Sequence, residues 1–466
     1  MPVQPDLTAK NTPGVGETFD WPLAYEAENL LRGHIDSFLR RHEWARRLAG
    51  RMQEETGTDF YEWVGHLTLS PDQAGSLRAV GLEVEPGPAP AGVTVMHHPK
   101  AMMPRVLLRA DGSREDVPTV VAIKPEILAD FLRAHRLAPE VEGAAGARLR
   151  SATVAGADGR RLVALERLGY RGFLIDVPAP GFAAVDEVHG LFRRRRRDFA
   201  DDGEGIRHAG QVLDQTLALV PRDVACEVFF AEERRFWESR NRAGRLQHQR
   251  QDRLGLGWGN HDHHTFRCSR RFFPDLVAFL ERLGLRKRER FYAGAEAGWG
   301  AQVLESSTVG LVVFADVDLQ PHEVNDDYAT RRLPPTGRLG TVGLWCALHG
   351  DSFLQAGMHH LEARFDFARL REQLADEGVA TMKPFSDFAF LKQAFTEGER
   401  WPVAPERIER LQAAGFITPD QAETFRRQGA LGSHLENLQR KGGFKGFNQQ
   451  AVSAIIAATD PRAAAH

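Results

Sequence analysis

The feature that most constrains the fold is a short strand followed directly by a helix, a pattern that occurs four times along the 466 residues. In the third helix the apolar residues Phe273, Leu276, Phe279, Leu280 and Leu283 recur at i, i+3 and i+4, which is typical of an amphipathic helix. The four pairs are Glu62–Leu69 with Pro71–Val80, Thr119–Ile123 with Pro125–His135, Asp262–Cys268 with Phe272–Leu283, and His359–Arg364 with Phe367–Glu377. Four similar openings indicate an internal repeat.

Each opening leads into further short strands, so each unit is predicted to be a β-α-β-β-β repeat. The further strands are expected at Val93–Val95, Arg105–Leu108, Arg161–Arg167, Arg171–Val177, Arg288–Tyr292, Ala301–Ser306 and Gly310–Val317. A unit of this kind cannot bury its sheet face alone, so two units must pair. We therefore predict an α+β fold in which repeated β-α-β-β-β units form two cupped barrels with helical insertions.

The repeats divide the chain into four predicted segments. These are residues 1–55 (a polar arm at Met1–Asp20 and a helix from about Trp21 to Glu55), 56–185 (an N-terminal barrel-like domain without a clear metal site), 186–255 (a helical connector), and 256–466 (a metal-binding catalytic barrel with a helical insertion). The basic run Arg193–Arg197 lies in the connector beside several acidic residues. We interpret it as the solvated face of a helix rather than a nucleic-acid contact.

The amino-acid composition limits the kinds of binding partner and the cellular compartment that we expect. The 60 Lys and Arg residues nearly balance the 63 Asp and Glu residues, so no electrostatic argument favours nucleic acid. The three cysteines, Cys226, Cys268 and Cys346, have no CxxC spacing, which predicts neither a disulfide framework nor a thiolate zinc site. No long apolar run and no basic start followed by an apolar stretch is present, so we expect a cytoplasmic protein without membrane insertion. The oligomeric state is left open.

The segment Gly257–Ser269 carries the densest chemistry of the chain, with three histidines, an aspartate and an arginine close together. Period-2 alternation along a strand would place His261, His263, Thr265 and Arg267 on one face, and His264, Phe266 and Cys268 on the other. The first face then offers a neutral imidazole for a metal and, further along, a fixed cation. This pairing favours a substrate carboxylate held beside a metal.

Two later segments offer further ligands. His359-His360-Leu361-Glu362 opens the fourth unit, and Glu436 lies in a short segment bounded by glycines that is typical of a final barrel strand. Two imidazoles and one carboxylate from different strands form the facial triad of non-haem iron(II) enzymes, although zinc takes similar ligands. Glu305 competes with Glu436 for the carboxylate position, and His359 is the alternative to His360. His66, alone in the first unit, is expected to be structural.

These motifs resemble a known family. Asp262–Arg267 resembles the Asp-His-x-x-x-Arg strand of the 2-oxoadipate dioxygenase/decarboxylase family (the hydroxyglutarate synthases) of the vicinal-oxygen-chelate superfamily. His359–Glu362 is similar to the second histidine strand of that family, His434–Arg440 to its glutamate strand, and Gly443–Asn448 to the segment that follows. The resemblance covers roughly Asn260–Ala457.

The resemblance implies iron(II) held by His263, His360 and Glu436, with Arg267 binding a substrate carboxylate. Thr265, on the same strand face, is a second candidate substrate contact. The implied activity is that of an iron(II) dioxygenase that converts a 2-oxo acid such as 2-oxoadipate, with dioxygen, to a 2-hydroxy acid and carbon dioxide. The alternatives are an extradiol ring-cleaving oxygenase or a metal-dependent isomerase or lyase of the same superfamily, and a non-catalytic protein that binds a small ligand.

Overall fold

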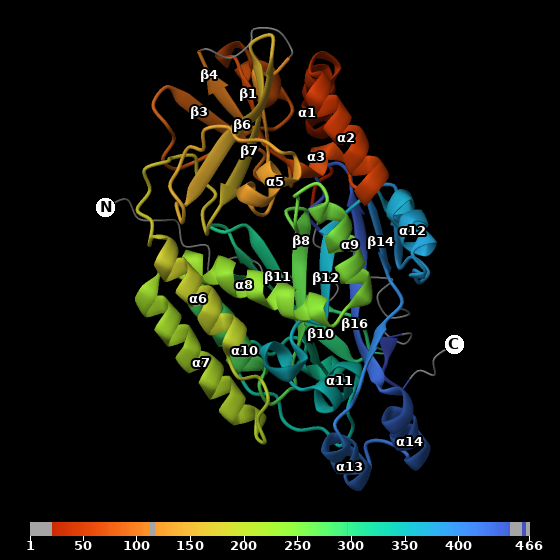
Figure 1. The fold of residues 1–466 in the computed structure, drawn as a ribbon. Coiled ribbons are helices and arrows are strands. Elements are labelled where there is room, and N and C mark those ends of the chain that lie inside the picture. The colour runs from red at the N-terminus through yellow and green to blue at the C-terminus, as the bar shows by residue number, and fades with distance from the viewer. Residues whose placement is uncertain (1–20, 111–116, 296, 448–458, 463–466) are drawn as a thin grey trace.

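The structure is a computed structural model that describes residues 21–110, 117–295, 297–447 and 459–462; the predicted arm at residues 1–20 and Asn448 lie outside these ranges. Two mixed, open β-sheets organise the described residues, one above the other in Figure 1. Helices α6, α7 and α8 stack beside the second sheet, and α13 and α14 lie at its far end.

The first sheet has seven strands in the order β2-β3-β4-β1-β5-β7-β6. Their bounds are β1 Val64–Leu69, β2 Glu83–Val84, β3 Val93–His97, β4 Arg105–Arg109, β5 Val120–Ile123, β6 Leu149–Ala157 and β7 Arg160–Arg167. β1 pairs in parallel with β4 and antiparallel with β5, so the two opening strands of this half meet at the centre of the sheet.

The second sheet has nine strands in the order β13-β14-β16-β12-β8-β11-β10-β9, with β15 paired to β16. Their bounds are β8 His261–Arg267, β9 Arg286–Tyr292, β10 Trp299–Ser306, β11 Leu311–Asp318, β12 His360–Arg364, β13 Ser386–Phe388, β14 Leu391–Phe395, β15 Glu399–Trp401 and β16 Ala430–Arg440. Here too the opening strands β8 and β12 pair antiparallel at the centre.

The helices lie at the N-terminus, between the sheets in sequence, and within each unit. Their bounds are α1 Tyr25–Arg41, α2 Glu43–Thr56, α3 Phe60–Trp63, α4 Ala74–Ala79, α5 Leu128–Ala134, α6 Phe182–Arg194, α7 Asp202–Leu219, α8 Arg222–Ser239, α9 Arg242–Asp252, α10 Phe273–Arg282, α11 Thr341–His349, α12 Phe367–Asp376, α13 Pro405–Ala413 and α14 Pro419–Gln428. None of the helices in the described residues is both long and apolar enough to cross a membrane.

The predicted α+β class and the repeated units are confirmed. Each of the four predicted openings is a strand followed by a helix, as in β8 with α10 and β12 with α12. Both sheets are open, so the predicted barrels are not closed rings of hydrogen-bonded strands. The predicted helical connector consists of α6, α7, α8 and α9. The limits of the four predicted segments stay a prediction.

Two predicted elements are wrong. The stretch Arg171–Val177 is not a strand, because the Leu174 N–H donates to the hydroxyl of Tyr170 at 3.2 Å and the segment closes on itself. The antiparallel partner of β7 is β6, whose polar and small residues hide its alternation, and β5 pairs with the other edge of β7. The single helix expected from Trp21 to Glu55 is two helices, because His42 has extended backbone angles and its side chain caps α2 by accepting from the Ala45 N–H.

The two faces of the second sheet differ in what covers them. Phe266, Leu361 and Leu435, on β8, β12 and β16, belong to one hydrophobic cluster with residues of α8 and α10. The neighbouring residues on these strands face the other way, because successive side chains of a strand alternate between faces. The helix-packed face therefore fixes the sheet, and the opposite face is available for chemistry.

The basic run Arg193–Arg197 is solvated only in part, because Arg193, Arg194 and Arg196 are exposed whereas Arg195 is buried. Helix α6 ends at Arg194, and the Arg195 side chain is buried against Glu233 of α8. Arg197 also contacts Glu233, with Nη2 2.6 Å from Oε1. Charge spacing along the run could not show that α8 supplies a buried carboxylate. These ion pairs hold the connector helices together.

We expect Glu233→Gln to lower the free energy of unfolding by ~3–5 kcal/mol, because it leaves two guanidinium groups without their buried counter-charge. Urea denaturation followed by tryptophan fluorescence measures the change. The matched control is Glu232→Gln on the same helix, whose partner Arg193 is half exposed and can be hydrated. Equal losses for the two variants would contradict the role given to Glu233.

Candidate metal centre

The hydrogen-bond register of β8, β12 and β16 places the candidate ligands in rows across the sheet. His263 lies opposite Glu362, and Glu362 lies opposite Glu436. Thr265 lies opposite His360, which is in turn opposite His434. Residues opposite each other on neighbouring strands project from the same face, so both rows project away from the helix-packed face.

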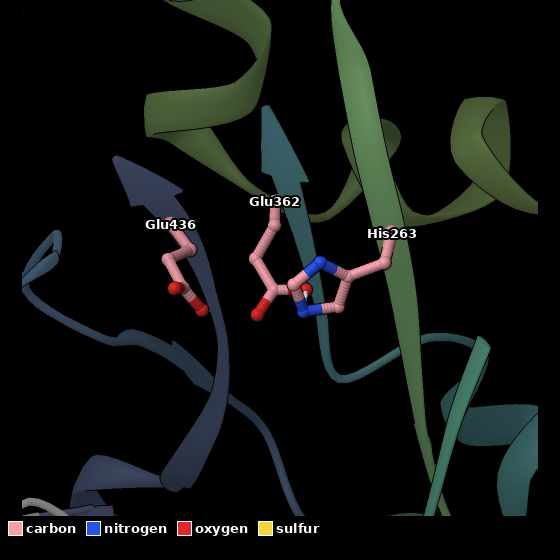
Figure 2. A group of neighbouring side chains, drawn as sticks. All are labelled: His263, Glu362 and Glu436. Carbon is pink, nitrogen blue, oxygen red and sulfur yellow. Dashed lines mark ion pairs between the residues drawn. The ribbon is translucent and has the colours of Figure 1, made fainter. Parts of the chain in front are cut away.

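His263, Glu362 and Glu436 form the one group within the described ranges that could hold a metal ion, with ligand atoms all within 4.8 Å of one another. All three are buried, and Figure 2 shows them pointing toward one another from three adjacent strands. The sequence analysis named His263 and Glu436 but missed Glu362. Its signal was available, since Glu362 is two residues after His360 and so shares its strand face.

His360 lies at the edge of this group. Its Nε2 is 3.5 Å from Oε1 of Glu362 and 3.6 Å from Oε2 of Glu436. The predicted ligands His263, His360 and Glu436 therefore line one pocket, and Glu362 adds a second carboxylate among them. An ion bound here would have up to two imidazoles and two carboxylates within reach.

The alternative ligands lie elsewhere. Glu305 pairs with Lys445 at 3.0 Å and with Arg288 at 3.2 Å, so it does not belong to the buried group. His359 lines the pocket, but its Nδ1 lies 2.6 Å from Nδ1 of His360, so one of the two must donate to the other. His359 thus orients the His360 ring.

A buried carboxylate fixes the orientation of the His263 ring and the position of its proton. The Nδ1 atom of His263 lies 3.0 Å from Oδ1 of Asp262. The two carboxylate oxygens of Asp262 also accept hydrogen bonds from Arg440, Oδ1 at 3.1 Å and Oδ2 at 3.2 Å. Burial lowers the pKa of His263 to about 4, so the ring is neutral. With its proton on Nδ1, the Nε2 atom is a bare acceptor, as in histidines that bind metals.

The charges around that nitrogen call for a cation. The Nε2 atom of His263 contacts Oε2 of Glu362, so either a proton on Glu362 or a metal ion must lie between these two atoms. Burial, followed by repulsion from Glu436, raises the pKa of Glu362 well above its ordinary value. Burial also raises the pKa of Glu436 to about 7, although Gln393 donates to its Oε1 at 2.8 Å. A divalent ion would relieve these repulsions, so the donor set fits a metal.

Arg267 is the second notable group on this face. Its side chain is buried, and neither Nε nor Nη1 has a hydrogen-bond partner. Asp316 lies opposite on β11, but burial raises the pKa of Asp316 to about 7 and its Oδ1 is also without a partner. A buried guanidinium that lacks partners costs free energy unless an anion binds it. Thr265, between Arg267 and His263 on β8, lines the same pocket.

The pocket is small and largely aromatic. Its cavity volume is about 70 Å³, and its walls include Phe291, Trp299, Phe314, Phe385, Phe395 and Phe447. Among the described residues that line it, Arg267 is the one arginine or lysine. This arrangement can exclude water from a metal and place one anionic group of a ligand beside it.

His261 departs from the predicted strand face. Its ring centroid lies 5.4 Å from that of His264, and its Nδ1 is 2.9 Å from the carbonyl oxygen of Trp258. The alternation fails because β12 shifts its register between Glu362 and Ala363, opposite this end of β8. His261 therefore does not line the pocket with His263.

The chain was compared with known proteins. No protein-family model and no curated protein matches it. A triple mutant of 4-hydroxymandelate synthase from Streptomyces coelicolor is similar in structure, with 14% identity and a TM-score of 0.29 over 86% of this chain and 98% of that one. A putative hydrolase from Shewanella frigidimarina has 13% identity and a TM-score of 0.32 over 46% and 92%.

Methylmalonyl-CoA epimerase from Mycobacterium tuberculosis has 12% identity and a TM-score of 0.23 over 39% of this chain and 88% of its own. TM-scores and identities this low carry no functional argument. The fold and the site described above rest on the strand order, the register and the side chains of this chain.

We expect Asp262→Asn to lower the affinity for a divalent metal by ~10–100-fold, because it removes the charge that orients His263. Metal content after equilibrium dialysis against iron(II) measures the change. The matched control is Glu305→Gln, which alters the competing carboxylate outside the group and should leave the metal affinity unchanged. Loss of metal in Glu305→Gln but not in Asp262→Asn would place the metal elsewhere.

Proposed function

We propose that this protein is an iron(II)-dependent dioxygenase of the vicinal-oxygen-chelate superfamily that converts a 2-oxo acid, such as 2-oxoadipate, to a 2-hydroxy acid and carbon dioxide. The observation that carries the proposal is the placement, in one pocket with aromatic walls, of a buried group of imidazoles and carboxylates and of Arg267, whose Nε and Nη1 atoms lack hydrogen-bond partners. The motifs on β8, β12 and β16 support it, because they resemble, in the same order along the chain, the first histidine strand, the second histidine strand and the glutamate strand of the 2-oxoadipate dioxygenase/decarboxylase family.

The residues divide between the metal and the substrate. His263, His360 and Glu436 would hold the ion, with Glu362 within reach as a further carboxylate. When bound, iron(II) supplies the open coordination positions that a 2-oxo acid and dioxygen need. Arg267 would bind a substrate carboxylate, and the aromatic walls would exclude water from the reacting atoms.

The number of cationic side chains in the pocket constrains how a substrate with two carboxylates would be placed. A dicarboxylate such as 2-oxoadipate brings two carboxylates, and Arg267 is the one arginine or lysine among the described lining residues. One carboxylate would therefore pair with Arg267, and the carboxylate of the 2-oxo acid group would lie at the metal. Thr265, between these two positions, would contact the body of the substrate.

The reaction predicts a distinct stoichiometry. We expect the iron-loaded protein to consume dioxygen and release carbon dioxide with a 2-oxo acid alone, without 2-oxoglutarate as a separate co-substrate. An oxygen electrode and trapping of labelled carbon dioxide, with 2-oxoadipate and with 2-oxo acids of other chain lengths, measure this. A natural substrate that turns over without oxygen uptake, or a product that keeps every carbon, contradicts the proposal.

We expect Arg267→Lys to lower kcat/KM by ~10–100-fold while iron content stays the same, because lysine cannot reproduce the two-pronged contact with a carboxylate. The control Arg282→Lys, whose ion pair with Asp214 is exposed and lies outside the pocket lining, should change kcat/KM by less than ~3-fold. A parallel loss of iron in Arg267→Lys would show that Arg267 supports the fold rather than the substrate.

A second candidate function is favoured by Glu362. Burial and the neighbouring Glu436 raise its pKa, which suits a carboxylic acid that carries a proton during turnover. A metal-dependent isomerase or lyase would use such a group, whereas an oxygenase would use it as a ligand. Turnover without oxygen uptake that is lost in Glu362→Gln would favour this second function.

A further inference from the structure

The two sheets repeat one topology strand for strand. The first sheet, β2-β3-β4-β1-β5-β7-β6, corresponds in order to β9-β10-β11-β8-β12-β16-β14 of the second. The directions agree at the centre as well, because β4 with β1 and β11 with β8 are parallel, while β1 with β5 and β8 with β12 are antiparallel. The first sheet therefore has its own counterpart of the face that carries the metal centre.

That counterpart lacks the metal ligands. His66 of β1 lies opposite Ala122 of β5, which lies opposite Val163 of β7. The corresponding strands of the second sheet carry Glu362 and Glu436 in the row of His263. The helix-packed face is retained, since Leu67 and Leu69 of β1 pack in one hydrophobic cluster with residues of α1, α2 and α5. The two sheets therefore differ on the open face and not on the helix-packed face.

A cavity of about 720 Å³ lies on this open face, much larger than the pocket at the metal centre. Its wall is apolar at Leu107, Val163 and Leu165, and His66 and Thr68 project into it from β1. The segment Phe173–Asp176 also lines it. A space of this size is typical of a site for a whole organic molecule.

Positive charge gathers at the buried side of the cavity. The guanidinium groups of Arg105 and Arg167 lie 4.4 and 4.9 Å from the ring centroid of Phe173, and the His66 ring lies 5.2 Å from it. Arg105 has one carboxylate partner, Glu85, at 3.0 Å, whereas Arg167 donates to the carbonyl oxygen of Gly172. The Nδ1 atom of His66 has no hydrogen-bond partner.

Electrostatics show that this charge is under-compensated. Burial, together with repulsion from Arg105 and Arg171, lowers the pKa of Arg167 to about 9. Burial, together with repulsion from Arg167 and Arg105, holds the pKa of His66 well below its ordinary value, so the His66 ring is neutral. The acidic residues that line the cavity, Glu140, Glu142 and Asp176, are exposed and belong to its rim. An anion at the buried side would relieve the repulsion.

We propose that the open face of the first sheet is a second, metal-independent binding site for an organic anion, with its carboxylate at Arg167 and His66 and its apolar body against Val163 and Leu165. The anionic head gains charge-assisted hydrogen bonds in a partly buried position. The apolar body gains burial against the sheet. This site does not depend on the proposed oxygenase activity, because none of its residues belongs to the metal centre.

Octanoate, which has one carboxylate and an apolar chain, is the probe, and isothermal titration calorimetry of the full-length protein without added metal is the measurement. We expect Arg167→Met to weaken octanoate binding at least ~10-fold, because it removes a charge-assisted hydrogen bond to the carboxylate. Val163→Trp, which places a bulky side chain on the wall where the apolar body is proposed to lie, should weaken binding at least ~10-fold. The neutral analogue octanamide should bind at least ~10-fold more weakly than octanoate for the same reason.

The matched control is Arg267→Met in the metal pocket, which should bind octanoate like the wild type, and circular dichroism confirms that each variant is folded. The proposal is overturned if the wild type does not bind octanoate at millimolar concentration, or if both Arg167→Met and Val163→Trp bind it as the wild type does. It is also overturned if Arg267→Met abolishes binding, since the anion would then occupy the metal pocket.

Discussion

The backbone register of β8, β12 and β16 is the constraint on which the site depends. It sets His263, Glu362 and Glu436 opposite one another, and a slip of one residue would turn these side chains toward the helices. The opposite face resists such a slip, because Phe266 and Leu361 are buried against α8 and α10 and would then face the pocket. Hydrophobic burial on one face therefore holds a costly group of polar side chains in place on the other.

Buried charges distinguish the site from the rest of the second sheet. Arg270 faces Glu323 and Arg440 faces Asp262, each through two hydrogen bonds, so these guanidinium groups are compensated within the fold. Arg267 has no comparable partner. Because buried N–H groups without hydrogen-bond partners are destabilising, the placement of Arg267 beside a group of repelling carboxylates fits ligands that bind there.

The strand-then-helix pattern predicted the repeated units, and strand alternation predicted the face shared by His263 and Arg267. Spacing alone left His359 or His360 and Glu305 or Glu436 open, and the choice of His360 and Glu436 came from the family resemblance. Strand alternation did not find Glu362, because the parity argument was applied to β8 and not carried to β12. It misplaced His261, since a register shift breaks the alternation there. The burial of Arg195 could not be predicted at all, because its partner Glu233 comes from a helix 38 residues away in sequence.

In both sheets the helix-packed face stabilises the fold, and the open face carries the residues that can bind ligands. Both keep one strand order and one apolar face against helices, which stabilises the sheet regardless of what the open face carries. On the open face, Ala122 and Val163 stand where Glu362 and Glu436 stand in the second sheet. In this row the two open faces therefore differ by two carboxylates, which the second sheet has and the first sheet lacks. The two halves of the chain can thus differ in function while the physics that folds them is the same.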